Sequence, residues 1–234
     1  MKIALLPGDA RQEILGELLC ADGHEVFPYT PGIPADAYLF PLPTGNHPAL
    51  AALPYNALAL TALAQGHYPH IRLRDYFATE AVQVANAAIT AETAIVMVQA
   101  HRDRVLMGSR VLILGFGRIG QALAPRLRAL GADVTVYARR AESRALAAGM
   151  GCRAMRSLPE QPDSFDIVFN TVPAQILPAV PDCLTVELAS APGGFRDASH
   201  VIPAPGLPGR LAPRSAAEAL YDSVRDILRK EGYA

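Results

Sequence analysis

The sequence has little charge and almost no lysine. Charged residues make up 18% of its 234 residues, the formal net charge is -1, and the lysines are Lys2 and Lys230 alone. This composition leaves no basic stripe for the phosphates of a nucleic acid or for an anionic membrane surface. Recognition of a small anion must therefore depend on arginines or on backbone N–H groups.

Cysteines and long apolar runs are also scarce. Cys20, Cys152 and Cys183 are odd in number and scattered, so they predict neither a disulfide framework nor a metal site. No window holds eighteen apolar residues, and Pro7 interrupts the first apolar run before a signal-peptide core could form. We expect a cytoplasmic protein that spans no membrane and binds no metal.

The first third of the chain predicts an α/β arrangement. Apolar runs at 2–6, 24–29 and 37–42 are typical of short strands, and 10–23 has the apolar periodicity of a helix. Prolines between 30 and 69 permit only short helices. The alternation at 81–86 predicts a further strand, after which Thr90 is expected to cap a helix over residues 91–105.

The rest of the chain alternates between strand and helix patterns. Apolar strands are predicted near residues 109–114, 132–139, 165–172, 184–190 and 200–206. This spacing predicts a Rossmann-like doubly wound parallel sheet, accompanied by a smaller N-terminal α/β domain. Pro125 is expected to kink the first helix of this sheet at Gln121 or to distort its N-terminus. Ser215 and Glu218 have capping-box spacing, which predicts a terminal helix.

A glycine-rich turn follows the run that ends at Leu114. Gly115, Gly117 and Gly120 have G-x-G-x-x-G spacing, in which the first permits a tight turn, the second lets a pyrophosphate approach and the third allows close helix packing. The helix N-terminus adds free N–H groups. A strand–helix turn without ligand is the alternative. The pattern predicts a dinucleotide site at Gly115, Phe116, Gly117, Arg118, Ile119 and Gly120.

Two arginines stand where an acidic residue is expected. In an NAD-binding fold, a carboxylate at the end of the second strand binds the ribose hydroxyls, whereas this chain has Ala138, Arg139 and Arg140 there. A guanidinium offers a planar set of donors that suits a phosphate. We therefore predict that Arg139 and Arg140 favour NADP over NAD, the alternative being a solvated basic turn.

Several motifs resemble the A subunit of dipicolinate synthase, and residues 30–74 carry no part of the resemblance. They are PGDARQ (7–12), NAAITAETAI (86–95), GSRVLILGFGRIG (108–120), FNTVPAQIL (169–177), ELASAPGGF (187–195) and APGLPGRLAPRSA (204–216). The resemblance implies NADP-dependent oxidation of a dihydrodipicolinate to dipicolinate during sporulation. It also implies a partner, the flavoprotein-like B subunit, and we expect a homo-oligomer.

The same resemblance implies how the chain is divided. Residues 1–88 would form an N-terminal α/β substrate domain that is completed by a C-terminal helix at 215–234. Residues 89–107 would form an interdomain helix, and residues 108–214 an NADP-binding Rossmann domain.

Loops after the fourth and fifth Rossmann strands would face a dinucleotide at the carboxyl edge of the sheet. We assign the first loop to the cofactor, through Asn170, Thr171, Val172 and Pro173. The second loop contains Ser190, Gly193 and Gly194, which we place at the boundary between cofactor and substrate, with Ser190 as a catalytic candidate.

A dicarboxylate substrate requires cations in its site. Arg11 and Arg214 are the candidates, although each could equally be a structural ion-pair residue. Glu92 could be the base that removes a proton, or it could orient a carboxylate-binding group, and Asn86 and Thr90 lie in the same family-like motif. As an exposed capping residue, Glu92 would have no chemical role. The catalytic candidates are thus Glu92, Arg11 and Ser190.

Two other functions fit the pattern in part. A 2-hydroxy-acid dehydrogenase shares the architecture but needs an arginine just after the fifth strand and a late histidine, and no histidine follows His200. A non-catalytic NADP(H)-binding subunit for assembly or sensing is the other alternative.

Overall fold

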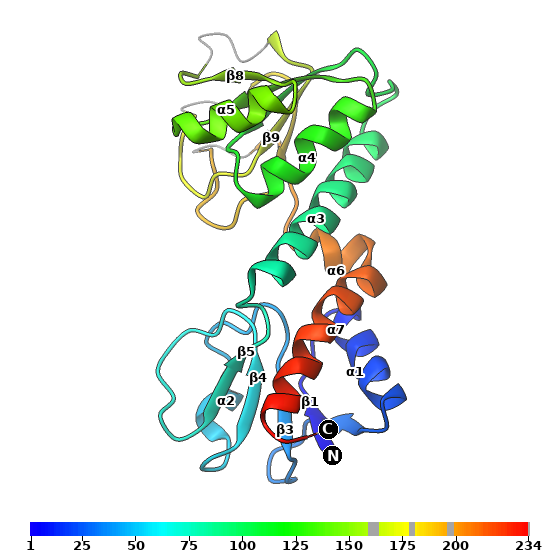
Figure 1. Ribbon diagram of the computed structural model, residues 1–234, viewed down its shortest axis with the longest axis vertical. Helices are drawn as coiled ribbons and strands as arrows, with labels where there is room; N and C mark the ends of the chain where they lie inside the picture. The colour runs from blue at the N-terminus through cyan, green and yellow to red at the C-terminus, as the bar shows by residue number, and fades with distance from the viewer. Residues whose placement is uncertain (159–163, 178–180, 196–198, 234) are drawn as a thin grey trace. The chain divides into compact units, whose positions relative to one another are not determined.

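The structure is a computed structural model that describes residues 1–158, 164–177, 181–195 and 199–233. The chain divides into two compact units (Figure 1). The first comprises residues 1–86 and 208–234, and the second comprises residues 87–207.

The first unit contains a five-stranded parallel sheet in the order β2-β1-β3-β4-β5. Alternate residues of a strand face opposite sides, so Ile3 packs toward helices α1 and α7, whereas Ala4 packs toward α2. Helix α7 packs along α1 (Figure 1). The elements are β1 (Lys2–Leu5), α1 (Ala10–Ala21), β2 (Glu25–Pro28), β3 (Ala37–Leu39), α2 (Ala49–Ala52), β4 (Leu58–Thr61), β5 (Arg72–Asp75) and α7 (Pro213–Lys230).

The second unit contains a six-stranded parallel sheet in the order β11-β10-β9-β6-β7-β8. From β6 the chain winds outward through β7 to β8 and then returns to β9 on the other side, which confirms the predicted doubly wound Rossmann-like fold. The elements are β6 (Arg110–Leu114), α4 (Arg118–Ala129), β7 (Asp133–Tyr137), α5 (Ala141–Gly149), β8 (Arg153–Met155), β9 (Ile167–Asn170), β10 (Leu184–Glu187) and β11 (Val201–Pro203). Of helix α6 (Leu207–Leu211), only Leu207 belongs to this unit, and the other residues belong to the first.

Helix α3 (Glu80–Ala100) corrects two predictions. The expected strand at 81–86 is helical, and Thr79 rather than Thr90 caps the helix, because the Thr79 Oγ1 accepts from the backbone N–H of Val82 at 3.4 Å. The helix ends at Ala100, so the expected 89–107 helix is wrong at both ends. By length and composition α3 is the one described helix that could cross a bilayer. Its residues from Ala91 to Val98 are largely buried in the core of the second unit.

Two further helices bear on the predictions. Helix α4 continues through Pro125 as far as Ala129, and the expected kink or distorted N-terminus stays a prediction. Helix α7 begins at Pro213, with Ala212 as N-cap, so the expected capping box that starts at Ser215 is wrong. Proline suits the first helical position because its fixed φ is helical and no N–H is needed there. The helix also ends at Lys230 rather than at residue 234.

Candidate functional site

The glycine turn follows β6, whose last four residues are fully buried. Gly115 has φ +92°, and its N–H donates to the Tyr137 carbonyl at 2.9 Å. A Cβ at Gly115 would lie 2.6 Å from the Thr171 Oγ1 and 2.7 Å from the Val172 Cγ2. Both the conformation and the close approach therefore require glycine at this position.

The other two glycines have different surroundings. A Cβ at Gly120 would lie 2.6 Å from the Gly115 carbonyl oxygen, so this glycine lets α4 pack against the turn. Gly117 is the N-cap of α4, has φ -79°, and would have no atom within 4 Å of its Cβ. Packing within the protein thus does not explain glycine at position 117. Open space beside a helix N-terminus fits the approach of a pyrophosphate.

A cavity of about 410 Å³ opens in front of this turn, at the carboxyl edge of the sheet. Seven of the predicted cofactor residues line it, whereas Arg118, Ile119, Gly120, Asn170 and Pro173 do not. Among the described residues that line it there is no carboxylate of the kind that binds ribose hydroxyls in NAD-binding folds. The described residues that line it are Gly115, Phe116, Gly117, Tyr137, Ala138, Arg139, Arg140, Ser143, Thr171, Val172 and Ile176.

Arg139 and Arg140 are exposed, and they lie on a turn that hydrogen bonds from Arg144 stabilise. Arg144 donates from Nη1 to the Ala138 carbonyl at 2.9 Å and to the Arg139 carbonyl at 2.6 Å. Arg140 is the N-cap residue of α5, and its side chain makes no capping bond. Among the described residues, neither Arg139 nor Arg140 uses its guanidinium in a hydrogen bond or ion pair. Both guanidinium groups therefore remain available to a ligand.

A buried polar network connects the loops after β9 and β10. Asn170 is fully buried, and its Nδ2 donates to the Glu187 Oε1 at 2.7 Å and to the Val172 carbonyl at 3.0 Å. Glu187 also accepts from the backbone N–H groups of Ala189, at 2.9 Å, and Gly194, at 2.7 Å. The Asn170 side chain thus positions the two loops. Its predicted direct contact with the cofactor stays a prediction.

Small residues are required around this network. A Cβ at Gly194 would lie 2.4 to 2.9 Å from the side-chain atoms of Asn170, and Gly193 has φ +77°. The Gly193 N–H donates to the carbonyl of the exposed Ser190 at 3.0 Å. These contacts give the loop a defined shape in which Ser190 faces solvent.

The proposed base and its neighbours lie along α3. Glu92 is exposed and occupies the fourth turn of the helix, well beyond the start that the sequence suggested. Thr90 is buried and Asn86 is half-buried, and both already have interactions within the protein. Asn86 belongs to the first unit, and Thr90 and Glu92 belong to the second.

The two candidate substrate arginines differ in burial. The Arg11 side chain is 7% exposed, its Nε lies 3.0 Å from Asp9 Oδ1, and its Nη2 donates to the Leu42 carbonyl. Arg214 is 62% exposed and lies 3.8 Å from Glu17 and 3.9 Å from Glu218. Both sets of contacts agree with the ion-pair alternative. A substrate role for either arginine stays a prediction.

Sequence reasoning missed four residues of this region. Tyr137, Ser143 and Ile176 line the cavity, and Glu187 organises the loops. The available signal for Glu187 was an acidic residue at the end of an apolar strand, whereas the register that places it opposite Asn170 is given by the structure. Within the described residues, no group of three or more His, Cys, Asp or Glu side chains could hold a metal ion.

Comparison with known proteins supports a dehydrogenase-like role. Residues 76–176 match the family model of the NAD-binding domain of D-isomer specific 2-hydroxyacid dehydrogenases. This match includes the glycine turn and the loop after β9, and it indicates a nicotinamide cofactor.

The chain is also similar to the A subunit of dipicolinate synthase, which confirms the resemblance stated above. It is 34% identical to the Bacillus subtilis (strain 168) protein over 171 residues, which is 67% of this chain and 58% of that protein. The match thus spans less than two thirds of that relative's length.

Solved structures of such proteins share the fold. The A chain of dipicolinate synthase from Bacillus subtilis is 26% identical, with a TM-score of 0.78, and the match covers 98% of this chain and 96% of that chain. The corresponding protein from Bacillus halodurans is 24% identical, with a TM-score of 0.82 and 97% of each chain covered.

Proposed function

We propose that this protein is an NADP-dependent oxidoreductase that converts a dihydrodipicolinate to dipicolinate, acting in the cytoplasm with a flavoprotein-like B subunit. Its similarity to the A subunit of dipicolinate synthase supports the substrate class. The observation that carries the cofactor choice is the cavity beside the glycine turn, whose described lining residues include Arg139 and Arg140 and no carboxylate.

The residues around the cavity fit a phosphorylated dinucleotide. Residues 115–120 would hold the pyrophosphate, because Gly117 leaves open space and the start of α4 offers backbone N–H groups. Arg139 and Arg140 would bind the 2′-phosphate through charge-assisted hydrogen bonds. Thr171 and Val172 would border the nicotinamide end. When bound, the oxidised cofactor supplies a hydride acceptor.

Substrate binding and proton transfer are assigned to the remaining candidates. Oxidation of a dihydropyridine dicarboxylate removes a hydride and a proton, and the aromatic product favours the reaction. Glu92 is exposed and makes no ion pair among the described residues, so its carboxylate is accessible to accept that proton. Arg11 and Arg214 would bind the substrate carboxylates, with Asn86, Thr90, Ser190, Gly193 and Gly194 in supporting roles. The protein would act as a homo-oligomer, with residues 1–88 as substrate domain and 108–214 as cofactor domain.

Cofactor preference can be tested by equilibrium titration. We expect NADPH to bind more tightly than NADH, and the Arg139→Gln/Arg140→Gln double variant to lose most of that preference. The charge-assisted hydrogen bonds that are lost are worth about 1.5–3 kcal/mol, so the NADPH dissociation constant should rise about tenfold or more. NADH binding should change little, because its ribose carries no phosphate.

Arg153→Gln is the matched control. Arg153 is an exposed arginine of the same unit, pairs with Asp133 at 3.2 Å and lies outside the cavity. This control should bind both cofactors as the native protein does. Tighter binding of NADH than of NADPH by the native protein would exclude the proposed role of the two arginines.

The reaction itself can be followed by absorbance of the reduced nicotinamide. Enzymatically generated dihydrodipicolinate is added with NADP, with and without a B subunit, to the native protein and to Glu92→Gln. We expect turnover by the native protein in at least one condition, and strongly reduced turnover with unchanged NADPH binding for the variant. Near-normal turnover of Glu92→Gln would remove Glu92 from the mechanism.

The match to the 2-hydroxyacid dehydrogenase domain favours one second candidate. That chemistry needs a cation and a proton-transferring histidine at the hydride site. The described loop 188–195 after β10 contains neither residue type. Oxidation of D-lactate without any oxidation of dihydrodipicolinate would favour this candidate. No turnover with either substrate, combined with tight NADPH binding, would favour a non-catalytic assembly or sensing subunit.

A further inference from the structure

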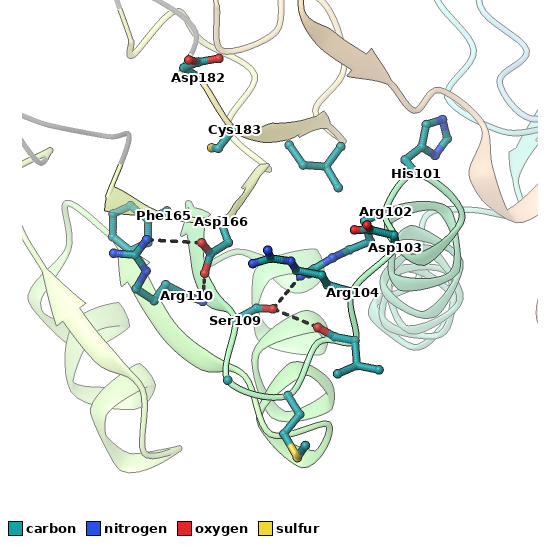
Figure 2. Close-up of a pocket in the computed structure, with 14 residues that line it drawn as sticks. His101, Arg102, Asp103, Arg104, Ser109, Arg110, Phe165, Asp166, Asp182 and Cys183 are labelled. Carbon is teal, nitrogen blue, oxygen red and sulfur yellow. Dashed lines mark hydrogen bonds and ion pairs between the residues drawn. The ribbon is translucent and has the colours of Figure 1, made fainter.

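A second cavity lies at the amino edge of the Rossmann sheet. It has a volume of about 860 Å³ and is formed where β6, β9 and β10 begin and by the segment that follows α3 (Figure 2). The glycine turn follows the opposite end of β6. A strand of five residues spans about 16 Å, so one small molecule at the glycine turn does not also fill this cavity.

Arg102 lines this cavity and has one unsatisfied donor. Its Nη2 donates to the Ser109 Oγ at 3.0 Å, and that hydroxyl donates to the Val105 carbonyl at 3.2 Å. The Nη1 atom of Arg102 is buried and has no hydrogen-bond partner. Leaving a buried donor of a charged group unpaired costs about 1–3 kcal/mol or more. The guanidinium is thus oriented by Ser109 with one edge unpaired.

Two other arginines line the cavity: Arg110 forms an ion pair, and Arg104 does not. The Arg110 N–H donates to Asp166 Oδ2 at 2.7 Å, and its Nη2 lies 3.3 Å from Oδ1 (Figure 2). These contacts occupy both Asp166 oxygens. Arg104, in contrast, is exposed and makes no hydrogen bond or ion pair with any described residue. Figure 2 shows Arg102 and Arg104 both extending from the segment after α3 into the cavity.

Two further carboxylates limit the size of the positive region. Asp103 and Asp182 line the same cavity and are exposed, and Asp182 already has an interaction of its own. Within the described part of the chain, Arg102 forms its side-chain interaction with Ser109 and no salt bridge with either carboxylate. The positive charge is therefore local to the unpaired edge of Arg102 and the side chain of Arg104.

We propose that this cavity is a second binding site, specific for an oxyanion group of a small metabolite, held by the guanidinium groups of Arg102 and Arg104, with the Arg102 guanidinium turning so that its buried Nη1 faces the anion. A phosphate or carboxylate offers oxygens that match the planar guanidinium and would satisfy the buried donor. The site does not depend on the cofactor choice proposed above, because it lies at the other edge of the sheet.

The test is isothermal titration calorimetry at constant ionic strength, with inorganic phosphate and, separately, with malonate. Arg102→Gln should raise the dissociation constant of the preferred anion about tenfold or more, as expected for a lost charge-assisted bond. Arg104→Gln should raise it about two- to fivefold, since this arginine is exposed. The anion that binds more tightly identifies whether the metabolite carries a phosphate or a carboxylate.

Two controls keep the result specific. Phosphate bound at the glycine turn would respond to the Arg139→Gln/Arg140→Gln variant, which should leave binding at the amino edge unchanged. Arg102→Lys retains the charge but not the fork, so it should fold and still bind more weakly. Equal affinity of the native protein and Arg104→Gln and Arg102→Lys would overturn the proposal. The proposal would also be overturned if the native protein bound neither phosphate nor malonate at about 10 mM, a concentration ten times a millimolar dissociation constant.

Discussion

Alanine substitutions at Gly117 and Gly115, each of which adds one methyl group, should separate the effect on ligand binding from the effect on stability. We predict that Gly117→Ala retains the stability of the native protein and loses affinity for the dinucleotide. Gly115→Ala should instead unfold at lower denaturant concentration. The two residues lie on the same turn, so each variant serves as the control of the other.

The expected stability of Gly117→Ala follows from its surroundings. The residue has φ -79°, which alanine adopts readily, and no atom lies within 4 Å of the added Cβ. Alanine is a poorer N-cap than glycine by up to about 1 kcal/mol, and it stabilises through the unfolded chain by about 0.4–1 kcal/mol. These effects nearly cancel, so the free energy of unfolding should change by less than about 1 kcal/mol.

The same methyl group would occupy the space through which a pyrophosphate approaches α4. A displaced phosphate loses a charge-assisted hydrogen bond worth about 1.5–3 kcal/mol. The dissociation constant for NADPH should therefore rise roughly tenfold to a hundredfold.

Gly115→Ala has the opposite balance. Its φ of +92° costs an alanine about 1–2 kcal/mol. The added Cβ would also lie 2.6 Å from Thr171 Oγ1 and 2.7 Å from Val172 Cγ2, and relieving that overlap costs about 1–3 kcal/mol. The total destabilisation should be about 2–5 kcal/mol.

The assays suit the composition of the protein. The chain has no tryptophan, so NADPH fluorescence can be titrated without indole emission, and urea unfolding is followed by far-ultraviolet circular dichroism. Native-like NADPH affinity of Gly117→Ala would refute the assignment of the turn to a pyrophosphate. A destabilisation of Gly117→Ala as large as that of Gly115→Ala would refute the interpretation of its surroundings.

Three further substitutions test the packing of the second unit. Glu187→Gln should destabilise the protein by about 1–3 kcal/mol, since its amide NH₂ would face a donor, in one orientation the Gly194 N–H; an unchanged urea midpoint would contradict this. Pro125→Ala should stabilise by about 1–2 kcal/mol, because alanine is the better helix former and regains an N–H, so a lower midpoint would count against a regular α4. The N–H and guanidinium of Arg110 lower the pKa of Asp166, so this carboxylate stabilises the fold above its unfolded pKa and stops doing so as pH falls through its folded pKa. The urea midpoint of the native protein should therefore exceed that of Asp166→Asn by less and less as the pH falls from about 6 to about 3. A difference in midpoint that does not change with pH would disprove this role of Asp166.

The Rossmann-like fold could be predicted because its central strands are buried on both faces and read as apolar runs. Residues 81–86 misled the prediction, since Val82 and Val84 alternate as in a strand. In the helix Val82 is buried and Val84 is 51% exposed, which is the helical rather than the strand pattern. The decisive signal, Thr79 as N-cap, lies outside the alternating stretch.

Other elements depend on partners far away in the sequence. Strand β5 is an edge strand without an apolar run, and its Arg72 and Arg74 pair with Glu231 at 2.6 Å each. The cluster involves residues more than 150 positions apart, so no local pattern predicts it.

The same limit applies to the site. The glycine turn and Arg139 and Arg140 are local motifs that line one cavity in the structure, and their contact with a cofactor stays a prediction. Glu187 was not found because its role depends on the register that places it opposite Asn170 and on the return of the chain at Gly194.

The carboxylate of Glu187 has a consequence for how this loop can change during evolution. One oxygen accepts from Ala189, near the start of the loop, and the other accepts from Gly194, at its end. These hydrogen bonds tie both ends of the segment to one carboxylate, so the number of residues between the two amides is fixed. Surface loops usually accept inserted or deleted residues, but here a single insertion between 189 and 194 would separate the two amides from their shared acceptor. Variation in this loop should occur by substitution at a constant length.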